Sequence, residues 1–161
     1  MMEKALINAC INNQLSVIKV LITKKLNLDY ADDFGKTALI YCAENGNLDA
    51  VKTLVNSGAD PGRTDHDSDT VLHKAVQSQN TELPKFLLTL PGIDVNCRNV
   101  RGETPLFLAA ATGNRDMVEM LMKAGARDLA NNGSITALDV ASANGASSIV
   151  ELIISGNPGS E

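Results

Sequence analysis

Hydrophobic and polar positions recur in blocks along the chain. Segments with small side chains, such as Ala109 and Ala110, precede segments with apolar residues at helical spacing, such as Val118, Leu121 and Met122. Spacings of three and four residues place side chains on one face of a helix. Polar stretches rich in Asp, Asn and Gly separate the blocks. The pattern predicts pairs of short helices that are joined by polar turns.

A short motif marks the start of each block. The step Thr-x-Leu recurs at intervals of 32 to 34 residues, and a degenerate first copy is expected around Leu6. A second marker, a Gly about 21 residues after each Thr, keeps the same phase and argues against a chance period. Each Thr is expected to cap a helix, because its hydroxyl can accept a hydrogen bond from a free backbone N–H. The four Thr residues are Thr37, Thr70, Thr104 and Thr136.

Glycines are placed at two further points of the period. Gly46, Gly113 and Gly145 follow the first helix of their blocks, where a residue that accepts positive φ can end it. Gly35 and Gly102 stand two residues before the capping Thr. Together with the polar residues around them, they predict a projecting β-turn.

This unit of β-turn, helix, turn and helix resembles the ankyrin repeat. The pattern Gly-x-Thr-Pro-Leu-x-x-Ala-Ala-x-x-Gly is complete from Gly102 to Gly113. The resemblance, to a small stand-alone ankyrin protein, implies an all-α solenoid of helix-turn-helix units with projecting β-turns or hairpins, each contacting its neighbours. We expect one domain, 1–156, with repeats at about 3–31, 32–64, 65–98, 99–130 and 131–156, and a disordered tail at 157–161.

The third copy departs most from the pattern inside the array. Gln79 stands where the helix-ending Gly belongs, and Ser68 replaces the turn Gly. If Thr81 caps the second helix, Pro84 lies in its first turn at little cost, whereas an earlier start would lose a backbone hydrogen bond. We therefore predict that residues 70–90 form the least protected interior unit.

Composition narrows the class of partner. The net charge of −5 argues against nucleic-acid and anionic-membrane surfaces, which attract basic proteins. Residues 26–69 carry nine acidic and three basic residues, a net charge of −6, and would favour a protein partner with a basic patch. No apolar run approaches the length of about 18 residues that spans a bilayer.

Cysteine usage predicts a reducing compartment. The three Cys are widely spaced and form no C-x-x-C motif, so no zinc or redox site is expected. Cys10 and Cys42 replace small residues of the repeat and are expected in the core. No signal peptide is apparent, and the cytoplasm, alternatively the nucleus, is the expected location.

No catalytic group or cofactor site is predicted. The resemblance accounts for His73, whose ring is expected to bond the backbone of the neighbouring turn, and no Ser or Cys is expected beside a His. The acids of 65–69 alternate like the start of a calcium loop, but Thr70 and Val76 occupy the positions of the required Gly and bidentate acid. A solvated acidic turn tip is expected there instead.

Two single residues have alternative interpretations. Phe34 stands at a turn tip, where it is either an exposed binding hot spot or packed on the adjacent turn. Asn96 occupies a place at which some ankyrin domains are hydroxylated on asparagine, and a structural role in its turn is the favoured interpretation.

The resemblance implies binding of another protein on a concave face made of turn tips and inner helices. We expect a monomeric adaptor or inhibitor with Phe34 and Arg101 as anchors. The alternatives are a spacer between partners and a metal-binding or catalytic protein that uses His66 and the acids of 65–69. The family's contact positions correspond to Asp33, Phe34, Lys36, Glu44 and Asn45 in the second copy, His66, Asp67, Asp69, Gln77 and Ser78 in the third, and Val100, Arg101, Glu103, Ala111 and Thr112 in the fourth.

Overall fold

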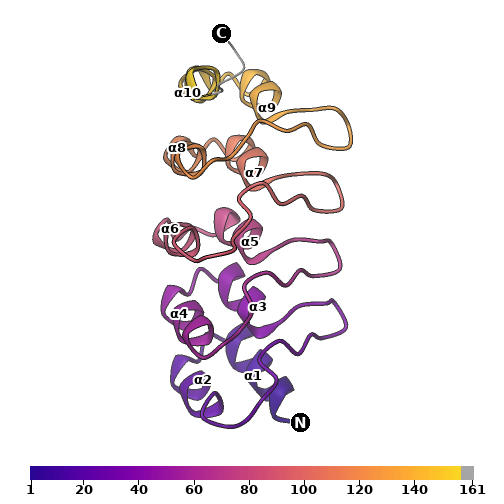
Figure 1. Ribbon diagram of the computed structural model, residues 1–161, viewed down its shortest axis with the longest axis vertical. Helices are drawn as coiled ribbons and strands as arrows, with labels where there is room; N and C mark the ends of the chain where they lie inside the picture. Colours follow the sequence, from indigo (N-terminus) through magenta and orange to yellow (C-terminus); the bar gives the residue numbers. More distant parts are fainter. Residues whose placement is uncertain (157–161) are drawn as a thin grey trace.

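A computed structural model describes residues 1–156, which form ten helices stacked in pairs (Figure 1). The prediction of an all-α solenoid is confirmed, and the tail expected at 157–161 lies outside the described residues. In chain order the pairs are α1 (Met2–Ile11) with α2 (Leu15–Leu21), α3 (Ala38–Glu44) with α4 (Leu48–Asn56), α5 (Val71–Gln77) with α6 (Glu82–Leu87), α7 (Pro105–Ala111) with α8 (Arg115–Lys123), and α9 (Ala137–Ala143) with α10 (Ser147–Gly156).

The odd-numbered helices form one column and the even-numbered helices another (Figure 1). Loops between the pairs project beyond the odd-numbered column (Figure 1). We call the odd-numbered helices, which adjoin these loops, the inner helices and the even-numbered helices the outer helices. The core is aliphatic, with Leu39, Leu72 and Leu106 buried at the same position of α3, α5 and α7. Cys10 and Cys42 are also fully buried, as expected of small core residues.

The predicted Thr caps are confirmed. The hydroxyl of Thr37 accepts the N–H of Ile40 at 3.3 Å, and the Thr residues before α5, α7 and α9 make the equivalent bond. Asn47 and Asn114 cap the outer helices α4 and α8 in the same manner, which the Thr-based motif did not predict. Both helices of these pairs therefore have a start signal in the sequence.

The third helix pair departs from this scheme. Ser78 follows α5 in an extended conformation, with φ −75° and ψ 163°. The inner helices α3, α7 and α9 are instead followed by a residue in the helical region and then by Gly. Thr81 stands at the start of α6, but its side chain makes no capping bond; Oδ1 of Asn80 accepts the N–H of Glu82 instead, at 3.0 Å. Thr81 is thus the N-cap residue by position without a side-chain cap, and Pro84 lies in the first turn, as expected for a helix that starts after Thr81.

Candidate functional site

Each projecting loop has a tip that is held by an Asp or Asn side chain. In the first tip, residues 32–36, Oδ1 of Asp32 accepts the N–H groups of Phe34 at 2.9 Å and Lys36 at 3.0 Å. Three further tips, residues 65–69, 99–103 and 131–135, repeat this pair of bonds at Asp65, Asn99 and Asn131. The Asp or Asn always stands five residues before the capping Thr. This regular spacing was present in the sequence and was missed.

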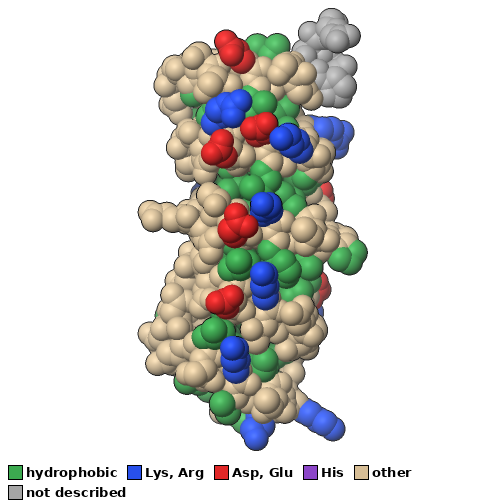
Figure 2. Space-filling view, turned by 90° about the vertical axis from the view of Figure 1, so that its left-hand side faces the viewer, with side chains coloured by type: hydrophobic (Ala, Val, Ile, Leu, Met, Phe, Trp, Pro, Cys, Tyr) green, Lys and Arg blue, Asp and Glu red, His purple; other side chains and the backbone are tan. Residues whose placement is uncertain are grey.

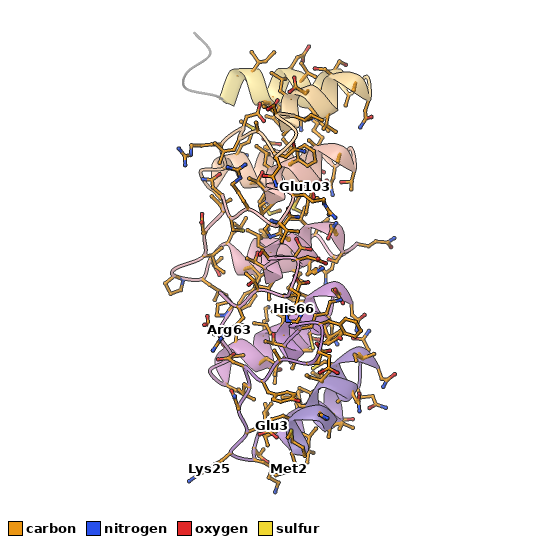
Figure 3. All side chains as sticks on the ribbon, turned by 90° about the vertical axis from the view of Figure 1, so that its right-hand side faces the viewer. Met2, Glu3, Lys25, Arg63, His66 and Glu103 are labelled. Carbon is orange, nitrogen blue, oxygen red and sulfur yellow. The ribbon has the colours of Figure 1, made fainter. Side chains whose placement is uncertain are left out.

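Backbone hydrogen bonds connect the four tips to one another. The N–H of His66 donates to the carbonyl of Phe34 at 3.1 Å, and the N–H of Val100 donates to that of Asp67 at 2.9 Å. The N–H of Asn132 donates to the carbonyl of Arg101 at 2.9 Å. The tips therefore form a continuous ladder along one side of the stack (Figures 1 and 3).

The ladder places three predicted contact residues at the same position of successive tips. Phe34, Asp67 and Arg101 each stand three residues before the capping Thr, and each supplies the carbonyl of the ladder. All three side chains are exposed, with Phe34 at 68%. This exposure contradicts the alternative in which Phe34 packs on the adjacent turn.

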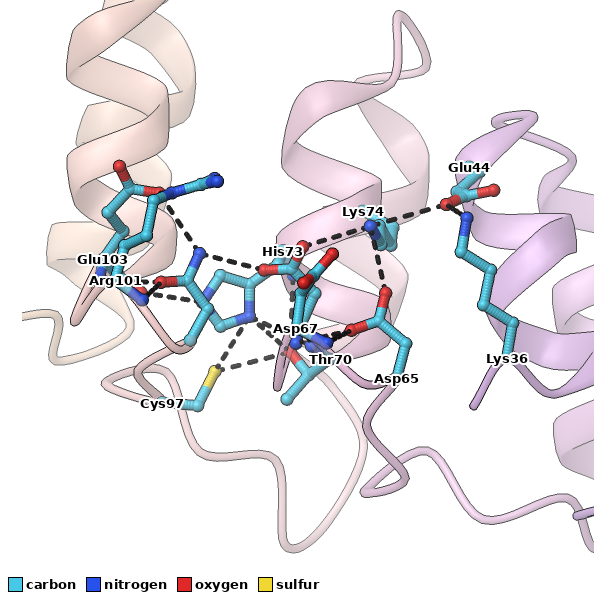
Figure 4. Close-up of polar contacts among 12 residues, drawn as sticks. Lys36, Glu44, Asp65, Asp67, Thr70, His73, Lys74, Cys97, Arg101 and Glu103 are labelled. Carbon is cyan, nitrogen blue, oxygen red and sulfur yellow. Dashed lines mark hydrogen bonds and ion pairs between the residues drawn. The ribbon is translucent and has the colours of Figure 1, made fainter. Parts of the chain in front are cut away.

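Behind the tips, charged side chains pair with one another. Nζ of Lys74 lies 3.2 Å from Asp65, 3.1 Å from Asp69 and 3.4 Å from Glu44, and Glu44 also pairs with Lys36 at 2.6 Å (Figure 4). The cation of α5 therefore joins the first tip, the second tip and α3. Four charged residues of the acidic segment 26–69 are therefore part of this internal network, namely Lys36, Glu44, Asp65 and Asp69.

The network continues to the third tip through Asn99. Its Nδ2 donates to Asp69 at 3.0 Å and to Glu103 at 3.1 Å, and Nε of Arg101 donates to Glu103 at 3.0 Å (Figure 4). Glu103 is half-buried, whereas the side chain of Arg101 is 65% exposed. Of the two charges in this pair, only the guanidinium is largely open to a partner.

The prediction of a solvated acidic tip at 65–69 is wrong for two of its acids. Asp65 and Asp69 are only 6% and 7% exposed, whereas His66 and Asp67 are exposed. Burial raises the pKa of Asp69, but hydrogen bonds from Asn99 and Lys74 outweigh it and hold the pKa below its usual range. The two buried acids are thus structural anions that stabilise the tip and bind Lys74.

The same contacts bear on the metal alternative. Among residues 1–156, no group of three His, Cys, Asp or Glu side chains is arranged to hold a metal ion. Asp65 and Asp69 direct carboxylate oxygens to Lys74, and the exposed His66 stands on the tip surface (Figure 3). The ammonium group of Lys74 lies between Asp65 and Asp69, where a metal ion bound to both carboxylates would have to lie.

The ring of His73 bonds the backbone of the neighbouring tip, as predicted, and also the backbone at the start of its own helix. Nε2 lies 2.9 Å from the carbonyl of Glu103 in the next tip, and Nδ1 accepts the N–H of Thr70 at 3.1 Å. The expectation that no Cys lies beside a His is wrong, because Sγ of Cys97 lies 3.7 Å from Nδ1 (Figure 4). The loop between α6 and α7 passes the start of α5, a path that the repeat spacing did not reveal.

The environment of this pair does not activate the thiol. Burial lowers the pKa of His73 and raises the pKa of Cys97, so both groups favour their neutral forms. A nucleophilic Cys–His pair needs the opposite shifts, toward thiolate and imidazolium. Because Nδ1 also accepts a backbone N–H, the geometry favours a structural role for both residues.

The remaining predicted residues lie at the ends of the inner helices and in one loop. Gln77, Ala111 and Thr112 are exposed, and Nδ2 of Asn45 donates to the carbonyl of Cys10 at 2.9 Å. The hydroxyl of Ser78 donates to the carbonyl of Ala75 at 2.7 Å. In the loop after α6, Asn96 accepts the N–H of Arg127 at 2.8 Å and donates to the carbonyl of Gly125 at 3.2 Å, which is the structural role expected of it.

Comparison with known proteins agrees with this geometry. The family described as ankyrin repeats (3 copies) matches residues 2–65 and 72–161. The chain belongs to the ankyrin repeat family. Ankyrin repeats are generally protein-interaction modules.

Several curated proteins are similar to this ankyrin chain. Human transient receptor potential cation channel subfamily A member 1 is 36% identical over 63% of this chain and 9% of its own length. Palmitoyltransferase AKR1 of Lachancea kluyveri is 34% identical over 71% of this chain and 16% of its own, and human inversin is 33% identical over 71% and 11%. The chain thus spans a small part of these relatives. Among residues 1–156, no helix combines the length and the hydrophobicity needed to cross a bilayer.

Proposed function

We propose that the chain binds a partner protein across its first three tips and the adjoining helices α3, α5 and α7. The observation that carries this proposal is the alignment of Phe34, Asp67 and Arg101. The three side chains are exposed at the same position of successive tips. The backbone carbonyl of each of these residues accepts one hydrogen bond of the ladder. A row of different side chains on one rigid edge can distinguish one partner from another.

Rigidity supports the proposal on energetic grounds. The backbone of each tip is fixed by its Asp or Asn, and the neighbouring tips are fixed to each other. A surface that is already ordered loses little conformational entropy when a partner binds. The polar network behind the tips adds further restraint, because it connects α3, α5 and the third tip.

Charge indicates how the partner is oriented. With Glu44, Asp65 and Asp69 paired internally, the exposed acids of the first two tips are Asp33 and Asp67. We expect these two carboxylates to attract a basic patch, while Phe34 supplies apolar contact. Arg101 offers a planar donor group for an acidic or carbonyl partner group at the third tip.

The role that fits best is that of a monomeric adaptor or inhibitor without catalytic activity of its own, in the cytoplasm or nucleus. The palmitoyltransferase relatives match over a small part of their length, so their named activity gives no reason to propose the same chemistry here. The neutral Cys97 and His73 pair also favours binding over catalysis.

Photo-crosslinking tests which face meets the partner. A photoreactive phenylalanine analogue introduced singly at Phe34, Asp67 or Arg101 should give crosslinked adducts in native host extract. The same analogue at Asp49, Lys85 or Lys123, exposed on the outer helices, is the matched control. The outer face carries interspersed charged and apolar side chains (Figure 2). Adducts only from the outer positions would refute the proposed face.

A further inference from the structure

The first tip has an unused donor in the ladder. Each later tip donates one N–H to the carbonyl of the preceding tip, at His66, Val100 and Asn132. The equivalent N–H in the first tip belongs to Asp33, and it has no acceptor among residues 1–156. The ladder therefore has an open edge where another extended backbone could add.

A groove with a volume of about 290 Å³ lies beside this open edge. One wall is α1, with Ile7 and Ile11. The other combines Phe34 of the first tip with Tyr30, which precedes the tip, and Tyr41 of α3. The chain has only two Tyr and three Phe, so three of its five aromatic side chains line this one groove. Phe34 is 68% exposed and Ile11 is 44% exposed, which leaves apolar surface available for contact.

The charges at the groove favour a cationic side chain over an anionic one. Asp32 and Asp33 stand on the tip wall, and Lys4 stands on the α1 wall. Asp32 is held by the hydroxyl of Tyr41 and two backbone N–H groups, whereas Asp33 is exposed with no ion pair among the described residues. Nζ of Lys36 already lies 5.2 Å from the centre of the Tyr41 ring, so an aromatic group of this groove accepts a cation from the protein itself.

We propose that the groove binds an extended peptide segment that carries an Arg or Lys next to an aliphatic residue. A carbonyl of the segment accepts the Asp33 N–H, the cation lies between the Asp33 carboxylate and the aromatic rings, and the aliphatic side chain contacts Ile7 and Ile11. The inference rests on the proposed protein-binding function and adds the chemistry of one partner segment, at a place beyond the first tip.

Synthetic peptides test the chemistry without a known partner. Fluorescence polarisation would measure binding of labelled peptides with a central Arg-Leu or Lys-Leu pair in a Gly/Ser background. The peptides are about ten residues long, so that an extended chain reaches beyond both ends of the pair. We expect binding about tenfold tighter than for the Gln-Leu, Glu-Leu and Arg-Ser peptides, since each comparison removes one predicted contact. Equal affinities across the set would overturn the proposal.

Matched variants locate the site on the intact chain. Asp33→Lys and Ile11→Ser should each weaken the Arg-Leu peptide about tenfold, the loss expected for one contact. Asp49→Lys makes the same charge change on the outer helix α4, and Ile135→Ser changes an isoleucine with the same 44% exposure. Both controls should bind as the wild type does. A control substitution that weakens peptide binding as much as the groove substitution it matches would show that the peptide binds outside the groove.

The Asp33 amide gives an independent readout. In the free protein its hydrogen should exchange faster than those of His66, Val100 and Asn132, and saturating Arg-Leu peptide should slow it about tenfold or more, as for other amides that gain a hydrogen bond. Peptide binding that leaves the Asp33 exchange rate unchanged would contradict the edge contact. If substitutions at Asp67 and Arg101 weaken a native partner while the Ile11 and Asp33 variants bind the peptide normally, the groove proposal fails and the proposed function stands. If the peptide results are as predicted while substitutions in the tips leave the affinity of that partner unchanged, the proposed function fails and the groove proposal stands.

Discussion

At the scale of single residues, Gly35 shows how closely the tips approach one another. A Cβ at this position would lie 2.5 Å from Cδ2 of His66 and 2.8 Å from its backbone N, in a residue with φ of 74°. Only glycine fits without moving the next tip. The hydrogen bond from His66 to Phe34 depends on this close approach.

We predict that Gly35→Ala destabilises the protein more than Gly113→Ala does. Gly113 has nearly the same φ, 73°, but no atom lies within 4 Å of its added Cβ. Gly113→Ala should therefore cost only the left-handed strain of about 1–2 kcal/mol. Gly35→Ala should add the clash with His66, and urea unfolding would measure the difference. Equal losses would mean that the tips tolerate separation.

A second residue prediction concerns the buried ring of His73. Burial lowers its pKa in the folded state from the ordinary value of 6.5, so the unfolded chain binds the proton first as the pH falls. The neutral ring therefore contributes stability above the unfolded pKa, and this contribution is lost below about pH 6.5, at up to about 1.4 kcal/mol per pH unit for one proton.

Unfolding free energies measured between pH 7.5 and about pH 5 would check this dependence, in the range where histidine titrates. His73→Gln should show a smaller decrease in that range than the wild type. His66→Gln, which removes the other histidine of the chain, is the matched comparison, and His73→Gln should lose more of the dependence than this variant does. A wild-type slope in His73→Gln would show that His73 is not the group responsible.

Residue-level features differ in how readily the sequence reveals them. The Asp or Asn five residues before each Thr is a local pattern, and a search of the period would have found it. The ion pairs of Lys74 connect α5 to α3 and to its own tip, and the contact of Cys97 with His73 depends on the path of a loop. Such contacts require the relative placement of elements, which periodicity does not give.

At the scale of elements, helix starts and ends followed local chemistry. Thr and Gly positions predicted the inner helices because capping bonds and positive φ act within a few residues. The third pair was less predictable, because Asn80 competes with Thr81 for the start of α6. Ser68 also adopts φ of 60°, a conformation that favours glycine.

These departures predict that residues 70–90 exchange amide hydrogens faster than residues 104–124. α6 has only six residues, and Ser68 carries left-handed strain that Gly102 avoids in the third tip. Native-state hydrogen exchange followed by mass spectrometry or NMR would compare the two segments. Ser68→Gly should slow exchange around α5 by removing the strain. Equal protection of the two segments in the wild type would contradict this prediction.

At the scale of the whole molecule, one stack carries two kinds of surface. The tips form a hydrogen-bonded edge with exposed and chemically different side chains, while the outer helices present interspersed charges (Figures 2 and 3). The repeat period predicted the stack and the direction of the tips. The net charge of the sequence overestimated the acidity of the tip side, because it counts Glu44, Asp65 and Asp69 whether or not they are paired.

The most direct test of partner binding by the tips is the affinity of a triple variant. A partner captured from native host extract and then purified would be titrated by calorimetry against Phe34→Ala, Asp67→Ala and Arg101→Ala combined in one chain. A control chain combines Asp49→Ala, Lys85→Ala and Lys123→Ala on the outer helices. We predict that the tip variant loses at least about 2 kcal/mol of binding free energy, roughly thirtyfold in Kd, while it keeps the wild-type Tm and the control binds normally. Unchanged affinity of the tip variant, with the outer-helix variant weakened, would contradict the proposed surface.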